Sequence, residues 1–188
     1  MTDSRTRPTP PLLTALRTAT TPAHRALEAM TMGGRILDGT LQLAEYDRLV
    51  RWQAAAHRLL EPYAEISSPS YRSESRLTTL PEVTPPALLP DQIGLSDTLP
   101  SRLGVAYVLE GGSLGGSLIV RKLRANPSLH DRTPFPFYTW QAERGLAQWR
   151  AYTTYVGELE LSSAEIDGAT RSAVRTFELF GELWRALS

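Results

Sequence analysis

The stretch from residue 103 to residue 118 combines the apolar side chains of a buried helix with an unusual number of glycines. Gly104, Gly111, Gly112, Gly115 and Gly116 fall within thirteen residues, and each glycine inside a helix costs about 1 kcal/mol relative to alanine. A flexible linker would not carry the valines, leucines and tyrosine that lie between these glycines. We therefore predict a core helix with one face free of side chains. Such a face suits close packing of another helix or a flat ligand against the backbone, and the glycines alone leave both open.

The composition narrows the class of protein. With 188 residues, 41% of them hydrophobic, the chain has the size of one domain, which we assign to residues 11–188 after a flexible N-terminal arm over 1–10. Twenty basic and twenty acidic residues balance, so we expect no nucleic acid as a partner. The absence of cysteine excludes disulfides, thiolate catalysis and iron–sulfur clusters. No apolar run resembles a signal peptide or reaches the length of a membrane span, so we expect a cytoplasmic protein without membrane contact.

The hydrophobic periodicity predicts an all-α fold. Apolar residues recur at three- and four-residue intervals over 11–30, 43–60, 103–123, 142–159 and, after a capping-box signature of Ser162 and Glu165, up to residue 187. Pro22 should kink the first helix or restart it from a cap at Thr20 or Thr21. We predict a turn over 33–40, and a long loop over 62–100 with short helical pieces near 71–80 and 88–93. No segment alternates as a strand would.

Three histidines are the candidates for metal binding or proton transfer. His57 lies on the apolar side of its predicted helix, where a structural role is the default, and His130 lies in a polar loop. His24 shares a helix face with Arg17, seven residues earlier, and Glu28, four residues later. A carboxylate one turn away can orient a metal-binding imidazole, and an arginine two turns away can meet an anionic group. Taken alone, this trio also fits ordinary surface residues.

One histidine and one helix face without side chains are the two surfaces needed to enclose a haem. The histidine would supply a single axial bond, and the glycines would leave the opposite side of the haem open to oxygen. Because no side chain in 103–118 is a strong second axial ligand, the pattern favours oxygen activation over electron transfer.

Two motifs then resemble those of the haem oxygenases, and of the compact bacterial, phytochrome-associated type in particular. The first runs from Leu16-Arg17 through Ala23-His24 to Leu27-Glu28, and the second is Tyr107-Val108-Leu109-Glu110-Gly111-Gly112-Ser113-Leu114-Gly115-Gly116. A third part, Leu159-Glu160-Leu161-Ser162 leading to Phe177 and Phe180, is similar to the closing helix of that family and its distal-side aromatics. The resemblance covers most of the chain. It implies a helical bundle with haem between the first helix and a glycine-rich distal helix.

The resemblance also implies an activity and a set of partners. The enzyme would open haem b, which is both its substrate and its cofactor, with O2 and electrons from an external ferredoxin or reductase, and release biliverdin, CO and ferrous iron. A bacteriophytochrome would be the partner that receives the biliverdin. His24 would be the axial ligand of the haem iron, with Glu28 orienting it. The other implied site residues are Arg17, Tyr107, Arg150 and Phe177 at the haem and Gly111, Gly112, Ser113, Gly115 and Gly116 on the distal side.

The chain departs from the family pattern at two places. Gly112 stands where the family carries Asp or Ser, a residue associated with the water that supplies protons, so Ser113 or Ser117 would have to replace it. Trp149 and Thr153 stand where animal enzymes carry basic residues that grip the haem propionates. A haem-binding or haem-sensing protein without turnover is therefore the alternative.

Two other classes of protein also have helical bundles. A two-iron helical enzyme needs glutamate three residues before its histidines, and this chain has Thr21, Ala54 and Pro127 there. A purely structural helical adaptor would use the glycines for packing alone.

Overall fold

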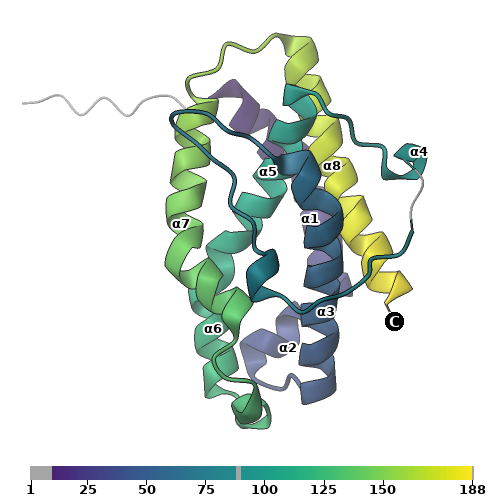
Figure 1. The fold of residues 1–188 in the computed structure, drawn as a ribbon, viewed down its shortest axis with the longest axis vertical. Helices are drawn as coiled ribbons and strands as arrows, with labels where there is room; N and C mark the ends of the chain where they lie inside the picture. The colour runs from purple at the N-terminus through teal and green to yellow at the C-terminus, as the bar shows by residue number, and fades with distance from the viewer. Residues whose placement is uncertain (1–9, 88–89, 188) are drawn as a thin grey trace, which may run out of the picture.

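The structure is a computed structural model that describes residues 10–87 and 90–187. Within these ranges the chain forms helices and loops, with one isolated bridge between Ser67 and Arg72, and the prediction of an all-α fold is confirmed. Figure 1 shows the arrangement. The helices are α1 (Pro11–Met30), α2 (Gly33–Asp38), α3 (Leu43–Leu60), α4 (Pro90–Ile93), α5 (Leu99–Gly112), α6 (Gly116–Ala125), α7 (Pro136–Val156) and α8 (Ser163–Ala186).

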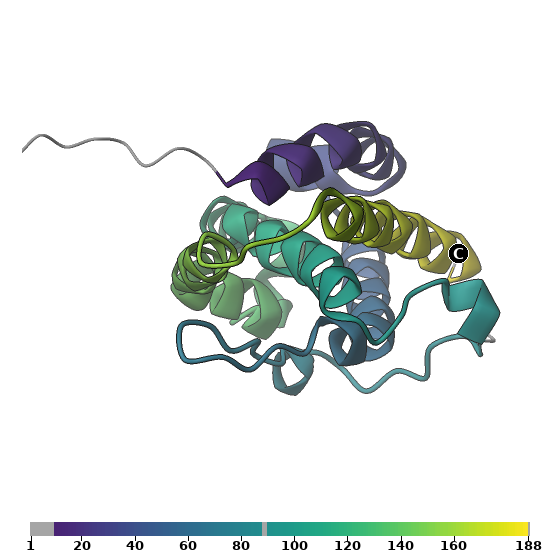
Figure 2. The same cartoon turned by 90° about the horizontal axis from the view of Figure 1, so that it is seen from above.

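Helix α8 is the element around which the bundle packs. It contacts α5, α1 and α3, whereas α6 packs mainly against α7. Seen from above in Figure 2, α1 lies along one side of the bundle and the loop after α3 lies along the opposite side. The predicted capping box starts α8: the Glu165 N–H donates to the Ser162 hydroxyl, and the Ser162 N–H donates to the Glu165 carboxylate at 2.8 Å. The buried stripe that follows includes Ala169, Ala173 and Phe180.

Three predictions about local structure are wrong. Of the two alternatives for Pro22, a kink or a restart, the restart is wrong: α1 continues through Pro22, and Thr20 and Thr21, instead of capping, donate their hydroxyls to carbonyls one turn earlier. The predicted turn over 33–40 contains α2, which ends at Gly39 in the left-handed region, with φ of 77°. The fifth helix begins at Leu99, four residues before the predicted start.

The long loop after α3 agrees better with its prediction. It contains short 3-10 turns at Glu61–Ala64 and Leu77–Thr79 before α4. Residues 88–89 of the predicted piece over 88–93 lie outside the described residues, as do residues 1–9 of the predicted arm.

The glycine-rich stretch forms α5 and α6, joined by a 3-10 turn at Ser113–Gly115. Two of these glycines allow neighbouring helices to pack closely against each other. A Cβ on Gly104 would lie 2.1 Å from the Ala169 carbonyl oxygen on α8, and one on Gly116 would lie 2.5 Å from Gln141 Cβ on α7. A Cβ on Gly112 would meet no atom within 4 Å. Close helix packing is thus confirmed at Gly104 and Gly116, whereas the open space beside Gly112 leaves room for a flat ligand.

The span Leu99–Ala125 is long and apolar enough to cross a membrane by length and composition, so the expectation that no stretch reaches that length is wrong. In the bundle, 56% of its most apolar window is buried. Because α5 packs against α8 and α6 packs against α7, the span has the position of a core helix in this fold.

Candidate functional site

A cavity of about 750 Å³ separates α1 from α5. This volume lies within the range of about 300–1,000 Å³ that small-molecule and cofactor sites occupy. Helix α1 forms one wall, α5 forms the facing wall, and α3, α7 and α8 contribute the remaining sides. Seven of the residues implied by the family resemblance line it: Arg17, His24, Glu28, Tyr107, Gly111, Gly112 and Phe177.

His24 and Glu28 form a pair on the α1 wall. The Nδ1 atom of His24 lies 3.3 Å from a carboxylate oxygen of Glu28, because residues four apart in a helix share a face. The imidazole also packs edge-to-face against the Phe177 ring, with ring centroids 5.7 Å apart. Phe177 therefore lies beside the histidine, and the expectation of a distal-side position for it is wrong. Since Nδ1 faces the carboxylate, Nε2 is the nitrogen that remains for a metal, which is the usual arrangement of a histidine ligand and its orienting partner.

The facing wall is backbone where α5 ends. Gly111 and Gly112 line the cavity, and a Cβ on Gly111 would come within 3.6 Å of the Trp149 ring. The space beside Gly112 is open. This combination leaves room for a flat group close to the main chain.

Two arginines of α1, Arg17 and Arg25, line the cavity with exposed side chains. Neither guanidinium forms an ion pair or hydrogen bond with any described residue, whereas Arg144 and Arg175 elsewhere each pair with glutamates. Two unpaired cations at the mouth of one cavity favour a ligand that carries two anionic groups.

Four implied residues lie away from the cavity lining. The Ser113 hydroxyl donates to the Leu109 carbonyl at 3.3 Å, and Gly115 faces Ile119. Gly116 lies against α7, and Arg150 is exposed on α7 without lining the cavity. Ser117, the other serine considered as a replacement for the missing polar residue at Gly112, donates to a carbonyl of α7 at 3.5 Å. Neither serine lines the cavity, so neither fills that role directly.

The sequence interpretation missed several lining residues: Arg25, Gln53, His57, Tyr138 and Gln141. His57 is 3% exposed, as its apolar helix face predicted, yet it reaches the cavity. Gln141 carries a buried side-chain oxygen without a hydrogen-bond partner. The amphipathic pattern of α3 predicted the burial of His57, but no local sequence signal could show that a cavity lies beside it.

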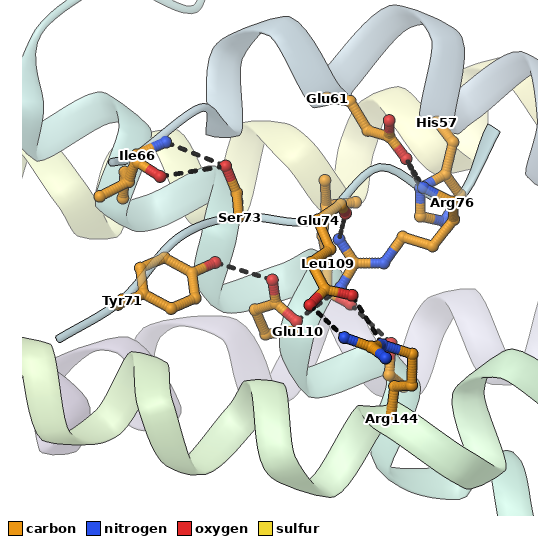
Figure 3. Close-up of polar contacts among 11 residues, drawn as sticks. His57, Glu61, Ile66, Tyr71, Ser73, Glu74, Arg76, Leu109, Glu110 and Arg144 are labelled. Atoms are coloured by element: carbon orange, nitrogen blue, oxygen red, sulfur yellow. Dashed lines mark hydrogen bonds and ion pairs between the residues drawn. The ribbon is translucent and has the colours of Figure 1, made fainter. Parts of the chain in front are cut away.

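His57 belongs to a buried polar network, shown in Figure 3. Its Nδ1 lies 3.0 Å from Glu61, which also accepts the Ser75 hydroxyl at 2.6 Å and the Arg76 N–H at 2.9 Å. Burial lowers the pKa of His57. Burial raises the pKa of Glu61, but the hydrogen bonds outweigh it and hold that pKa below its usual value.

The Arg76 guanidinium continues this network to α5. It pairs with Glu110 at 2.5 Å, and both side chains are almost fully buried. The Tyr71 hydroxyl donates to the other carboxylate oxygen of Glu110 at 2.7 Å, and burial, followed by the nearby Glu110 charge, raises the pKa of Tyr71. Glu110 precedes Gly111 in the chain, so the network fixes the backbone of the glycine wall from behind.

A second hollow, of about 800 Å³, lies between the start of α1 and the connection from α7 to α8. Its lining is mostly apolar, and among the described residues Glu160 is the one ionisable side chain in it. No histidine or arginine of residues 10–87 or 90–187 lines it, so the cavity between α1 and α5 is the better candidate for chemistry. Among the described residues no cluster of three or more His, Asp or Glu side chains could hold a bare metal ion.

These features define an all-α protein with a cofactor-sized cavity between a histidine-bearing helix and a glycine wall. The family model described as "Heme oxygenase" matches residues 72–186. The match spans more than half of the chain, and the chain belongs to the haem oxygenase family. No curated protein and no solved structure gives a significant match.

The family match contains α5 to α8 but not α1. The assignment of His24 therefore depends on the geometry of the cavity. That geometry fits a haem: Nε2 of one histidine is available, the facing wall is open beside Gly112, and two unpaired arginines lie at the mouth. A haem has one axial position for the histidine and two propionates for the cations.

Proposed function

We propose that this protein is a haem oxygenase that opens haem b to biliverdin, CO and ferrous iron, using O2 and electrons from an external donor. The observation that carries the proposal is the His24–Glu28 pair facing the Gly111–Gly112 wall across one cavity, in a chain of this family. When bound, the haem supplies the iron at which oxygen is activated.

The protein's own residues have binding and orienting roles in this proposal. His24 Nε2 would be the axial ligand, and Glu28 would fix the orientation of the ring. Arg17 and Arg25 would receive the propionates at the mouth. Gly111 and Gly112 leave space on the reacting side, and the rings of Trp149 and Phe177 line the cavity and reduce its contact with water.

The partners follow from the resemblance and the family. We propose a ferredoxin or a separate reductase as the electron donor, because haem opening consumes electrons that haem itself does not supply. A bacteriophytochrome as the recipient of biliverdin rests on the resemblance to the phytochrome-associated type alone.

The test is a spectroscopic turnover assay. One equivalent of hemin is added to the purified protein, then a reductant in air with catalase present, and the visible spectrum is followed. We expect the Soret band to form, then bleach while a bile-pigment band rises in the red, and His24→Ala to lose this behaviour. A Soret band that does not form at stoichiometric hemin would refute haem binding, and one that persists under reductant would refute turnover.

One observation favours a second candidate, a haem-binding or haem-sensing protein without turnover. Gly112 has no side chain, and Ser113 and Ser117 lie outside the cavity lining, so the family's usual polar group on this wall is missing. In that case oxygen bound by the reduced complex would be released unchanged, and the same spectra would show a stable haem band.

A further inference from the structure

Two buried polar side chains that line the cavity, His57 and Gln141, belong to α3 and α7, whereas the arginines of the mouth belong to α1. Gln141 is placed on the glycine side, because its Cβ lies against Gly116, one turn beyond Gly112. The His57 ring meets the edge of the Phe137 ring, one turn before Gln141 on α7, with centroids 5.3 Å apart. His57 and Gln141 therefore both line the part of the cavity on the α5 and α7 side.

The hydrogen bonds of His57 define which ring nitrogen faces the cavity. Glu61 accepts hydrogen bonds from Ser75 and from the Arg76 N–H, and its lowered pKa keeps it ionised at neutral pH. An ionised carboxylate 3.0 Å from Nδ1 requires the hydrogen to be on Nδ1. Nε2 is then an acceptor without a partner among the described residues, on a side chain that lines the cavity.

The charges around His57 support the neutral ring. Glu61, from the turn after α3, is the anion that faces it, and Arg76, from the loop, is the cation. The aromatic contact from α7 is Phe137, which has no charge. Burial and Arg76 lower the pKa of His57, whereas Glu61 raises it.

Gln141 supplies a second acceptor. Its side chain is 7% exposed and its Oε1 atom has no hydrogen-bond partner. Buried oxygens in native proteins are nearly always satisfied by protein or water. The Oε1 atom of Gln148, on the same helix, is also buried and without a partner, but Gln148 does not line the cavity.

We propose that His57 Nε2 and Gln141 Oε1 hold the water that delivers protons to the reacting side of the haem. This inference rests on the proposed function and fills the role that the missing side chain at Gly112 leaves open. One O–H of the water donates to the histidine or to the amide, and its other O–H points into the cavity. The water gives that proton to an oxygen atom of the O2 substrate. The hydroxide that remains takes a proton from solvent water that enters at the mouth of the cavity. His57 keeps its Nδ1 hydrogen throughout and is a positioning residue.

Glu61 makes this arrangement testable in the absence of haem. In Glu61→Gln the amide oxygen should take the place of the carboxylate oxygen that faces His57, because that oxygen also accepts the Arg76 N–H, and the amide NH2 should face the Ser75 hydroxyl. In Glu61→Leu no acceptor for the Nδ1 hydrogen remains. Nitrogen-15 NMR of the imidazole groups in the apo protein should show the Nδ1–H tautomer for His57 in the wild type. The Glu61→Gln variant should keep the Nδ1–H tautomer, and Glu61→Leu should lose the preference for it.

The main experiment compares four variants with the wild-type protein: His57→Phe, His57→Gln, Gln141→Leu and the control Gln148→Leu. We measure hemin affinity, the pH midpoint of the visible spectrum of the ferric haem complex, and turnover. His57→Phe and Gln141→Leu should keep hemin affinity within about threefold and shift the pH midpoint by about half a unit or more. They should slow turnover about 100-fold or more, since positioned proton transfer typically contributes about 10²- to 10⁴-fold. His57→Gln, which keeps an acceptor, should recover part of the rate. Gln148→Leu should match the wild type.

Each outcome decides the inference. An Nε2–H tautomer in the wild type overturns it, as does an unchanged pH midpoint in both His57→Phe and Gln141→Leu, or an equal shift in Gln148→Leu. If the wild type binds haem without opening it, the proposed function fails, and the tautomer and the pH midpoint still test the position of the water. If His57→Phe does not fold, Glu61→Leu and Gln141→Leu carry the same comparison.

Discussion

Exchanging glycine for alanine at two positions of the glycine-rich stretch should give opposite changes in stability. At Gly112 the new methyl group meets no atom within 4 Å, and the backbone is helical with φ of −60°. The substitution therefore gains the helix propensity of alanine, about 1 kcal/mol. At Gly116 the methyl group would lie 2.5 Å from Gln141 Cβ and 2.7 Å from the backbone nitrogen of Ala142. Such an overlap costs about 1–3 kcal/mol, and a side-chain rotation cannot relieve it because part of it is with backbone.

The expected difference in unfolding free energy between Gly112→Ala and Gly116→Ala is thus about 2–4 kcal/mol, with Gly112→Ala the more stable. For a domain of this size that corresponds to roughly 4–16 °C in Tm. Urea unfolding of the two apo proteins, followed by circular dichroism, measures the difference directly. Equal stabilities, or a less stable Gly112→Ala, would refute the division of the glycines into packing and cavity positions.

Haem binding gives the second half of the same test. Gly112→Leu should fill the space beside the wall and weaken hemin binding at least tenfold, while the apo protein remains folded. Gly116→Ala should lose stability but keep its hemin affinity, since Gly116 lies outside the cavity lining. Parallel losses of stability and affinity in both variants would contradict the assignment.

Four other substitutions test the remaining features. His24→Ala should lose the Soret spectrum of a histidine-ligated haem, whereas His130→Ala should keep it; absorption spectra of the hemin complexes compare the two. Arg25→Gln, which removes one cation of the mouth, should weaken hemin binding about three- to tenfold and move the haem methyl signals in paramagnetic NMR. Glu110→Ala should lower the unfolding free energy by about 3–5 kcal/mol, because it leaves a buried guanidinium unpaired; denaturant titration measures the loss. His57 has a lowered pKa in the folded state, so the unfolded chain binds more protons below about pH 6.5. The free energy of unfolding should therefore decrease as the pH is lowered below that value. His57→Phe should flatten this part of the stability profile, and an unchanged slope would count against the shift.

The helices themselves were largely predictable from periodicity and caps. The bounds of α3 agree with the prediction, and the capping box of α8 is present. Pro22 misled because a proline removes one hydrogen bond but does not by itself end a helix that is packed along its length. The start of α5 at Leu99 was missed because Pro100 lies in its first turn, where proline is tolerated and does not mark a loop.

The site was only partly predictable, for a physical reason. His24, Glu28 and Arg17 share one helix face, so the spacing of residues was enough to group them. Whether a glycine faces a neighbouring helix or a cavity depends on elements far away in the chain, as the contact of Gly116 with α7 shows. His57 was assigned to the core correctly, but its contact with the cavity depends on the relative position of α3 and α7, which no local pattern encodes.

The distribution of buried residues along α1 links ligand binding to the stability of this helix. Its three buried residues, Leu12, Leu16 and Thr20, all lie in the first half of the helix. The second half, which contains His24, has no buried residue. The second half of α1 borders the cavity on the side where other helices of the bundle pack against a neighbouring helix. A planar apolar ligand held there would act as an imported piece of hydrophobic core, and its binding free energy would add to the stability of the segment that holds it. Ligand release would then loosen the helix end that bears His24, so cargo exchange and local folding would be one equilibrium rather than two.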